Sequence, residues 1–173
     1  MDTTRTPVRL SNEVSMTLSR ILAAATFCLP AVALANPNGM TWATYGHDST
    51  YGADTVSCHG GSRSCNAYTG DTSCARALPV LCINQDGSSN PGATTGTYTQ
   101  WAAGNIATTL PVLGTALASA SNADAICENA FGTGWRMAEF HDGWGWGFVA
   151  LGHVRDDRRF WVYIDDQPAN CWD

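Results

Sequence analysis

Six cysteines after residue 35 constrain this chain more than any other feature of its sequence. They are Cys58, Cys65, Cys74, Cys82, Cys127 and Cys171. In a chain exported to an oxidising compartment, an even number of cysteines predicts a disulfide framework, although six cysteines can pair in about 15 ways. Zinc is the competing explanation for clustered cysteines, but no C-x-x-C pair is present to supply neighbouring thiolates. We therefore expect a small domain held together by disulfides.

The first 35 residues indicate export. Arg20 precedes the apolar run ILAAATFCLPAVALA, which ends in a small-x-small cleavage pattern. We predict a signal peptide over residues 1–35, cleaved before Asn36, with Met16 as an alternative start. The apolar run is shorter than the roughly 20 residues that cross a bilayer, so we expect no membrane span. The expected location is secreted, either extracellular or at the cell surface, with the periplasm as the alternative.

Residues 36–173 are enough for a single domain with one core. They contain six arginines, thirteen acidic residues and no lysine, which gives a net charge of −7. A nucleic-acid partner requires a basic surface, so we exclude this class of partner. The charged run RDDRR, residues 155–159, predicts a solvated turn, with an arginine clamp for an anionic partner as the alternative.

The clearest helix signal covers residues 123–131. Ser121 or Asn122 is the expected N-cap, Asp124 lies in the first turn, and Gly132 ends the helix. The segment is short, so the rest of the domain must be built from strands and loops.

Several apolar segments predict strands. The run 77–83 is typical of a buried strand, and the turn cluster NQDGSSNPG follows it. That cluster lacks the acidic residue that closes an EF-hand loop, so we expect a plain turn and no calcium. Two more strands are expected over 97–104 and 105–115, and another over 159–164. The core residues predicted from these strands are Tyr98, Trp101, Ile106, Leu110 and Val112, together with Phe160, Val162 and Ile164 on one face.

Residues 120–173 resemble a C-type lectin-like domain. The resemblance is carried by the strand FWVYIDD and by a helix cysteine followed by glycines, a strand and an acidic position. These residues are Ala123, Cys127, Gly132, Gly134, Met137, Ala138 and Asp142. The resemblance implies an α+β fold that is mostly antiparallel β with one helix, and it implies that Cys171 is the partner of Cys127. The loop DDQPAN before Cys171 is too short for the calcium loop of sugar-binding members. The C-terminal run is also similar to that of exported bacterial proteins.

This resemblance agrees with the disulfide pairing that we favour. We expect two local pairs, Cys58 with Cys65 and Cys74 with Cys82, and one long-range pair, Cys127 with Cys171. The long-range pair brings the segment after the helix to the same end of the molecule as the C-terminal residues.

The strongest candidate for a binding surface is the glycine-rich run HDGWGWG, residues 141–147. Trp144 and Trp146 alternate with glycines, which give backbone freedom but little packing. We expect both indoles on a loop, where they form an apolar platform that stacks on a sugar ring. The alternative is that they cover the sheet as a lid, whereas Trp101, Trp135 and Trp161 are assigned to the core. The full predicted ligand-binding set is Trp144, Trp146, His141, Asp142, Asp165, Asp166, Gln167 and Asn170.

Catalysis is the weaker interpretation of the same residues. His141 and Asp142 are adjacent, so on an extended segment their side chains point to opposite faces. No G-x-S-x-G or H-E-x-x-H motif supplies a nucleophile or a metal, although His153, Asp156 and Asp157 lie close enough in sequence to join His141 in a cluster.

We therefore predict a non-catalytic secreted protein that binds a glycan or another extracellular surface ligand, without cofactor or metal. A structural subunit or adhesin of an extracellular assembly is the first alternative, which would require self-association. A metal-dependent hydrolase is the second alternative.

Overall fold

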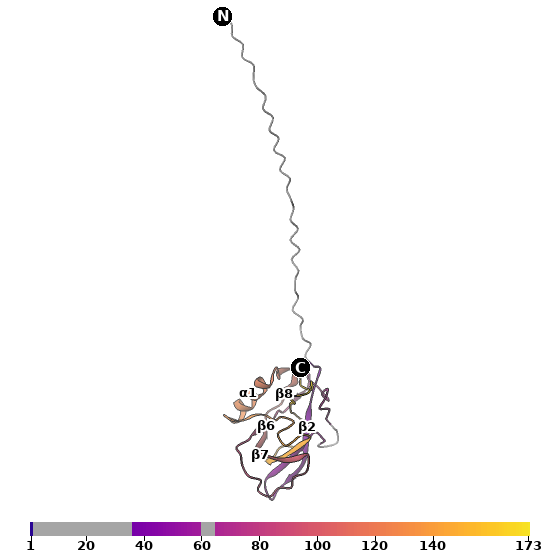
Figure 1. Ribbon diagram of the computed structural model, residues 1–173, viewed down its shortest axis with the longest axis vertical. Helices are drawn as coiled ribbons and strands as arrows, with labels where there is room; N and C mark the ends of the chain where they lie inside the picture. Colours follow the sequence, from indigo (N-terminus) through magenta and orange to yellow (C-terminus); the bar gives the residue numbers. More distant parts are fainter. Residues whose placement is uncertain (2–35, 60–64) are drawn as a thin grey trace. The chain divides into compact units, whose positions relative to one another are not determined.

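A seven-stranded mixed sheet forms the centre of the domain in the computed structural model (Figure 1). The structure describes Met1, residues 36–59 and residues 65–173, so the predicted signal peptide lies outside the described residues except for Met1. In the order in which they lie side by side, the strands of the sheet are β11 (Phe160–Trp161), β2 (Thr41–Asp48), β3 (Ala53–Ser57), β10 (Gly147–Leu151), β7 (Thr99–Thr108), β6 (Leu81–Asn84) and β9 (Arg136–Met137).

The pairing within this sheet is antiparallel except between β10 and β7, which are parallel. Two small antiparallel pairs accompany the sheet: β1 (Asn38–Gly39) with β4 (Thr72–Ser73), and β5 (Ala77–Leu78) with β8 (Val112–Leu113). A 3-10 turn, Gly114–Ala116, precedes the helix α1 (Ala120–Phe131). The predicted α+β class, mostly antiparallel with one clear helix, is confirmed for the described residues.

The helix begins earlier than predicted. Its N-cap is Ser119, whose extended backbone lets the side-chain oxygen accept a hydrogen bond from the Asn122 amide at 3.1 Å. Ser121 and Asn122, the expected caps, therefore lie inside the first turn. Gly132 ends the helix as predicted, and its amide donates to the Glu128 carbonyl oxygen at 2.8 Å. In the described part of the chain, no helix is long and apolar enough to cross a membrane.

Three apolar clusters form among the described residues, and alternating side chains along β6 lie in two of them. Leu81 and Ile83 of β6 belong to the first cluster, whereas Cys82 belongs to the second, which the helix covers with Ala123 and Cys127. The C-terminal segment alternates in the same way. Phe160, Val162 and Ile164 lie together in the first cluster, as predicted, and Trp161 lies in the second.

The predicted strand boundaries were less accurate than the predicted faces. The run 77–83 is interrupted at Pro79 and splits into β5 and β6. The span 97–115, where two strands were expected to divide near residue 104, instead forms one long strand, β7, followed by the two-residue strand β8. Tyr98 and Leu110 are exposed rather than buried, because they flank this strand in turns instead of lying within it. Trp161 is fully buried, while Trp101 and Trp135 are only partly buried against the apolar clusters.

All six cysteines are bridged, but two of the three pairs differ from the prediction. Cys58–Cys65 is confirmed, whereas the other bridges are Cys74–Cys171, with a sequence separation of 97, and Cys82–Cys127, with a separation of 45. Cys82 lies on the face of β6 that packs against the helix, so the helix cysteine meets it directly.

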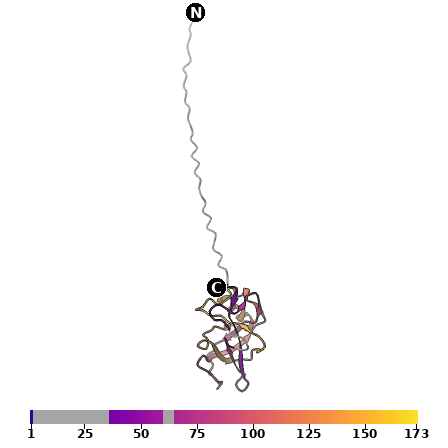
Figure 2. The same cartoon turned by 90° about the vertical axis from the view of Figure 1, so that its right-hand side faces the viewer.

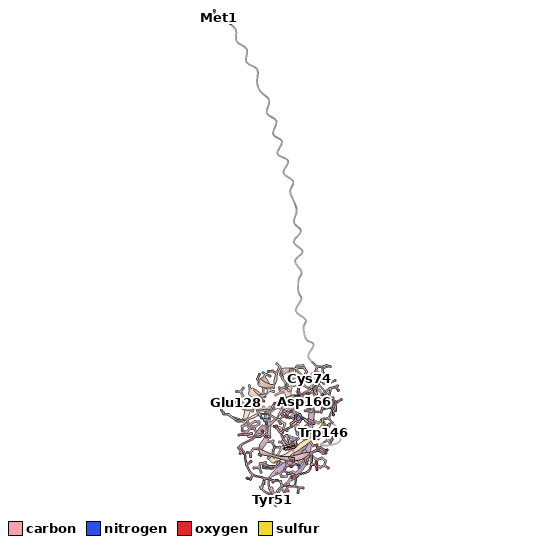
Figure 3. All side chains as sticks on the ribbon, in the orientation of Figure 1. Met1, Tyr51, Cys74, Glu128, Trp146 and Asp166 are labelled. Atoms are coloured by element: carbon pink, nitrogen blue, oxygen red, sulfur yellow. A yellow bond between two sulfur atoms is a disulfide. The ribbon has the colours of Figure 1, made fainter. Side chains whose placement is uncertain are left out.

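Cys74 meets Cys171 because the two ends of the domain lie together. The Cys74 amide donates to the Pro37 carbonyl at 2.9 Å, and the Asn36 amide donates to the Asp173 carbonyl at 2.6 Å. The C-terminus lies at one end of the domain, near α1 and β8 (Figures 1 and 2). Tyr51, in the turn between β2 and β3, marks the opposite end (Figure 3).

Candidate functional site

An open, mostly apolar groove with a volume of about 430 Å³ lies over the sheet where β2, β3, β7 and β10 are neighbours. Tyr45 and Tyr98 line this groove and remain 72% and 63% exposed. The complete lining is Tyr45, Ser57, His59, Tyr98, Thr99 and Trp146. Exposed aromatic side chains around a concave apolar surface mark a ligand-binding site more often than a purely structural region.

Trp146 is held firmly at this groove. Its ring stacks on the His59 ring with centroids 5.2 Å apart and packs edge-on against Phe140 at 5.3 Å. Its carbonyl oxygen accepts hydrogen bonds from the Cys58 amide at 2.9 Å and the Ser57 hydroxyl at 3.0 Å. The indole is therefore half-buried, with one edge in the core and part of its surface in the groove.

The glycines beside the tryptophans serve close packing, which sequence reasoning did not anticipate. A Cβ atom at Gly147 would lie 2.8 Å from the Val56 carbonyl oxygen, and one at Gly143 would lie 2.2 Å from the Phe148 Cβ. Both contacts are shorter than side chains tolerate, so these positions admit only glycine without a shift of the surrounding strands. The loop that carries Trp146 is consequently pressed against the sheet.

Trp144 lies in a different environment from Trp146. Its side chain is 83% exposed, its backbone has a φ of 74°, and its amide donates to the His141 carbonyl at 3.1 Å. Among the described residues, no ring contact joins the two indoles, and Trp144 does not line the groove. The lid alternative is therefore wrong for Trp144, which points into solvent.

A second cluster of predicted residues surrounds Glu139. The Glu139 carboxylate accepts hydrogen bonds from the His141 amide at 2.5 Å and from the His141 ring Nδ1 at 2.9 Å. The exposed carboxylates of Asp165 and Asp166 lie 3.6 Å and 4.0 Å from the His141 ring nitrogens. Glu139 was not selected from the sequence, because nothing local marks a glutamate as the buried centre of such a cluster.

Backbone pairing, not a disulfide, brings His141 to the C-terminal acidic residues. The premise that a Cys127–Cys171 bridge unites these segments is wrong. Glu139 instead forms a parallel bridge with Tyr163, and the Phe140 amide donates to the Tyr163 carbonyl at 2.9 Å.

Three other predicted residues hold the scaffold together. Asp142 is almost buried and forms an ion pair with Arg136, while also accepting from the Glu139 amide at 2.8 Å. Its side chain contacts Arg136 and the Glu139 amide, whereas the His141 side chain contacts the Glu139 carboxylate. Asn170 is buried, and its side chain bonds to the amide and carbonyl of Ile164 at 3.0 Å and 2.8 Å. Gln167 is half-buried, and its carbonyl accepts from the Ala169 amide.

The burial of Glu139 changes its pKa and so makes the stability of the fold depend on pH. Desolvation raises the pKa of Glu139 above its ordinary value of 4.5, although the hydrogen bonds from His141 act in the opposite direction. Folding therefore favours the protonated form. The stability that this preference contributes is fully present below the unfolded pKa and is lost as pH rises through the folded pKa.

We expect the Glu139→Gln variant to gain stability relative to the wild type as pH rises from about 4 to about 7, because glutamine does not ionise. Urea denaturation of both proteins across this range measures the difference. A Glu128→Gln variant, altered at an exposed position of α1, is the control and should show little pH-dependent difference. If the stability of Glu139→Gln relative to the wild type instead falls as pH rises, the pKa of Glu139 is not raised by folding.

The residues expected to form a metal or acid-base cluster with His141 lie elsewhere. Asp157 forms ion pairs with Arg155 and Arg158 in an exposed segment, as expected for a solvated charged turn. Arg159, the last residue of the predicted turn, is instead mostly buried, and its Nε donates to the Thr41 hydroxyl oxygen at 2.6 Å. His153 instead contacts His47, with ring centroids 4.3 Å apart.

Trp146 is the one residue of the groove lining that the sequence also indicated as a candidate, and its neighbours were not selected. Tyr45 lies on β2, His59 follows β3 and Tyr98 precedes β7, so only the strand order reveals that they line one surface. Comparison of the chain with protein-family models, with curated proteins and with solved structures found no match. The site is therefore interpreted from its own geometry.

Proposed function

We propose that this protein is an exported, non-catalytic binding protein that recognises a glycan through the aromatic groove. The supporting observation is the open groove lined by Tyr45, His59, Tyr98 and Trp146, two of whose aromatic side chains are mostly exposed. An aromatic ring offers a flat apolar face, and a tyrosine also carries a hydroxyl group. A sugar ring has the complementary combination of apolar C–H faces and equatorial hydroxyls.

The rigidity of the groove supports recognition of a ligand in this position. The Trp146 carbonyl oxygen accepts hydrogen bonds from Ser57 and Cys58, and the Trp146 ring contacts the rings of His59 and Phe140. A preformed surface loses little conformational entropy when a ligand binds, so more of the stacking energy remains as affinity. Thr99 supplies a hydroxyl group to the same lining, whereas the Ser57 hydroxyl is engaged with the Trp146 carbonyl and the His59 amide.

Secretion is part of this proposal. Three disulfides in a domain of this size fit an extracellular protein, because such bonds persist in oxidising compartments. The C-type lectin-like resemblance also stays a proposal, and the bridge between Cys82 and Cys127 differs from the bridge that the resemblance implied.

An assembly subunit is less well supported than a binding protein. Both edge strands of the seven-stranded sheet, β11 and β9, are only two residues long. Short edge strands offer few unpaired backbone groups to another chain, so they are poor templates for polymer formation by strand addition.

Truncation of the exposed groove tyrosines should weaken glycan binding. We expect Tyr45→Ala and Tyr98→Ala each to raise the dissociation constant about 10-fold, because truncating an aromatic side chain that anchors a ligand costs more than about 1 kcal/mol, and about 1.4 kcal/mol corresponds to a factor of 10. A glycan array identifies the ligand, and isothermal titration calorimetry with that ligand measures the affinity. Because both side chains are exposed, these variants should keep the fold.

Tyr68→Ala is the matched control, since Tyr68 is 58% exposed and lies outside the groove lining. This variant should have the same affinity for the glycan as the wild type. A chelator should leave the affinity of the wild type unchanged, because the proposal involves no calcium. Trp144→Ala tests whether the exposed indole extends the same surface. Binding that survives both groove substitutions, or an array without any bound glycan, would refute the proposal.

A further inference from the structure

Two imidazoles and one carboxylate from separate parts of the chain meet at the side of β3. The His47 Nδ1 lies 2.6 Å from an oxygen of Asp54, and the His153 Nδ1 lies 3.3 Å from each ring nitrogen of His47. One donor atom from each of the three residues lies within 4.8 Å of the others. We propose that His47, Asp54 and His153 form a binding site for a late first-row divalent cation, with Zn²⁺ as the fitting ion.

The sheet places these residues accurately. His47 on β2 and Asp54 on β3 are direct cross-strand partners, so their side chains leave the same face of the sheet. Asp54 is also paired with Ala150 of β10, and His153 follows the end of that strand. Two of the donors therefore lie on adjacent strands, and the third lies two residues beyond the end of the next strand.

The spacing of the donors suits a tetrahedral ion. Zinc binds imidazole nitrogens at about 2.0–2.1 Å, so two ligands of a tetrahedral site lie about 3.3 Å apart. The two imidazole nitrogens of His47 and His153 already have this separation. The shorter distance between His47 and Asp54 is that of a hydrogen bond, and it would lengthen by about 0.7 Å when the cation replaces the shared proton.

Charge favours a cation at this position. Asp54 is completely buried, and its second oxygen accepts a hydrogen bond from the Val154 amide at 2.5 Å. Its ion-pair partner among the described residues is the His47 imidazole, whose charge depends on protonation. A buried carboxylate is costly unless a positive charge balances it, and a bound divalent cation supplies that charge over a wide pH range.

Solvent reaches the cluster, because the side chains of His47 and His153 are exposed. Zinc sites with three protein ligands characteristically keep a fourth position for water or another small molecule. Two histidines and one carboxylate are a donor set that zinc and its neighbours in the first row accept, whereas calcium and magnesium prefer oxygen ligands.

A second group in the described residues, Glu139, His141 and Asp165, also has donor atoms within 4.8 Å of one another. It offers one imidazole and two carboxylates, instead of two imidazoles and one carboxylate. This group is therefore the weaker candidate for a zinc site, and the experiment tests it as the alternative location.

The four histidines of the chain allow a matched panel of single substitutions to glutamine. Each purified protein is titrated with ZnSO₄ in competition with a chromogenic chelator, and the Co²⁺-loaded forms are compared by visible absorption. We expect the wild type to bind one equivalent of Zn²⁺. His47→Gln and His153→Gln should weaken binding at least about 10-fold, whereas His59→Gln and His141→Gln should leave it unchanged.

His153→Gln is the decisive variant, because it removes one imidazole while the hydrogen bond between His47 and Asp54 stays in place. Its thermal unfolding without metal is measured alongside, to confirm that the variant folds. Zinc should raise the unfolding temperature of the wild type and not of this variant. Absence of stoichiometric binding by the wild type, or binding lost in His141→Gln and retained in His153→Gln, overturns the proposal.

Discussion

Replacing Cys74 and Cys171 together by alanine is expected to lower the free energy of unfolding by between about 4 and 5 kcal/mol. The bridge closes a loop with a sequence separation of 97, and the loss follows from the entropy that the unfolded chain regains when so long a loop opens. Equilibrium urea denaturation of the oxidised proteins measures this difference. The variant should also lose order where the N-terminal and C-terminal segments meet, because backbone hydrogen bonds there join Asn36 to Asp173.

The matched control is the double variant Cys58→Ala, Cys65→Ala. That bridge spans a separation of only 7, so its loss should cost about 2.5 kcal/mol by the same entropic relation. If this control is destabilised as strongly as the Cys74 and Cys171 variant, the stabilisation does not follow from the lengths of the loops that the two disulfides close. Peptide mapping under non-reducing conditions provides a direct check, and a peptide that joins Cys74 to Cys82 would show that the pairing is different.

Truncation of Trp161 to alanine should cost about 3–5 kcal/mol, which is the usual range for a fully buried large aromatic residue. The indole is only 1% exposed, and it packs in the cluster that also contains Cys82, Cys127 and Cys171. Its Nε1 donates a hydrogen bond to the Val112 carbonyl oxygen at 3.1 Å. The substitution therefore leaves both a cavity and an acceptor without its donor.

Trp144→Ala is the control for this measurement, since it removes the same side chain from a solvent-exposed position. Its free energy of unfolding should stay within about 0.5 kcal/mol of the wild type. Urea denaturation monitored by far-ultraviolet circular dichroism avoids the bias of losing a fluorescent tryptophan. Equal destabilisation by the two substitutions would mean that Trp161 is not the core residue that its burial indicates.

The hairpin of β2 and β3 contributes to both proposed sites. Tyr45 and Ser57 line the aromatic groove, whereas His47 and Asp54 belong to the proposed cation site nearer the turn. The two proposals use different residues, so the Tyr45→Ala and His153→Gln variants separate them experimentally. Loss of zinc binding with glycan binding retained is the result expected for His153→Gln.

Local signals in the sequence predicted the elements whose formation depends on near neighbours. The helix over 123–131, its end at Gly132 and the exposed ion pairs among residues 155–158 all depend on contacts within a few residues. The alternation that places Phe160 and Val162 on one face is likewise a property of the extended chain. Such features are determined by residues that are close in sequence, so they can be predicted without knowledge of the fold.

The choice of partners between distant segments was decided only by the tertiary structure. Six cysteines indicate disulfides, but the helix cysteine pairs with Cys82 because β6 happens to lie beneath the helix. In the same way, the groove and the cluster of His47, Asp54 and His153 exist because β3 and β10 are neighbours and β7 runs parallel to β10. The order of the strands depends on how the whole domain buries its apolar surface, so no local pattern of residues predicts it.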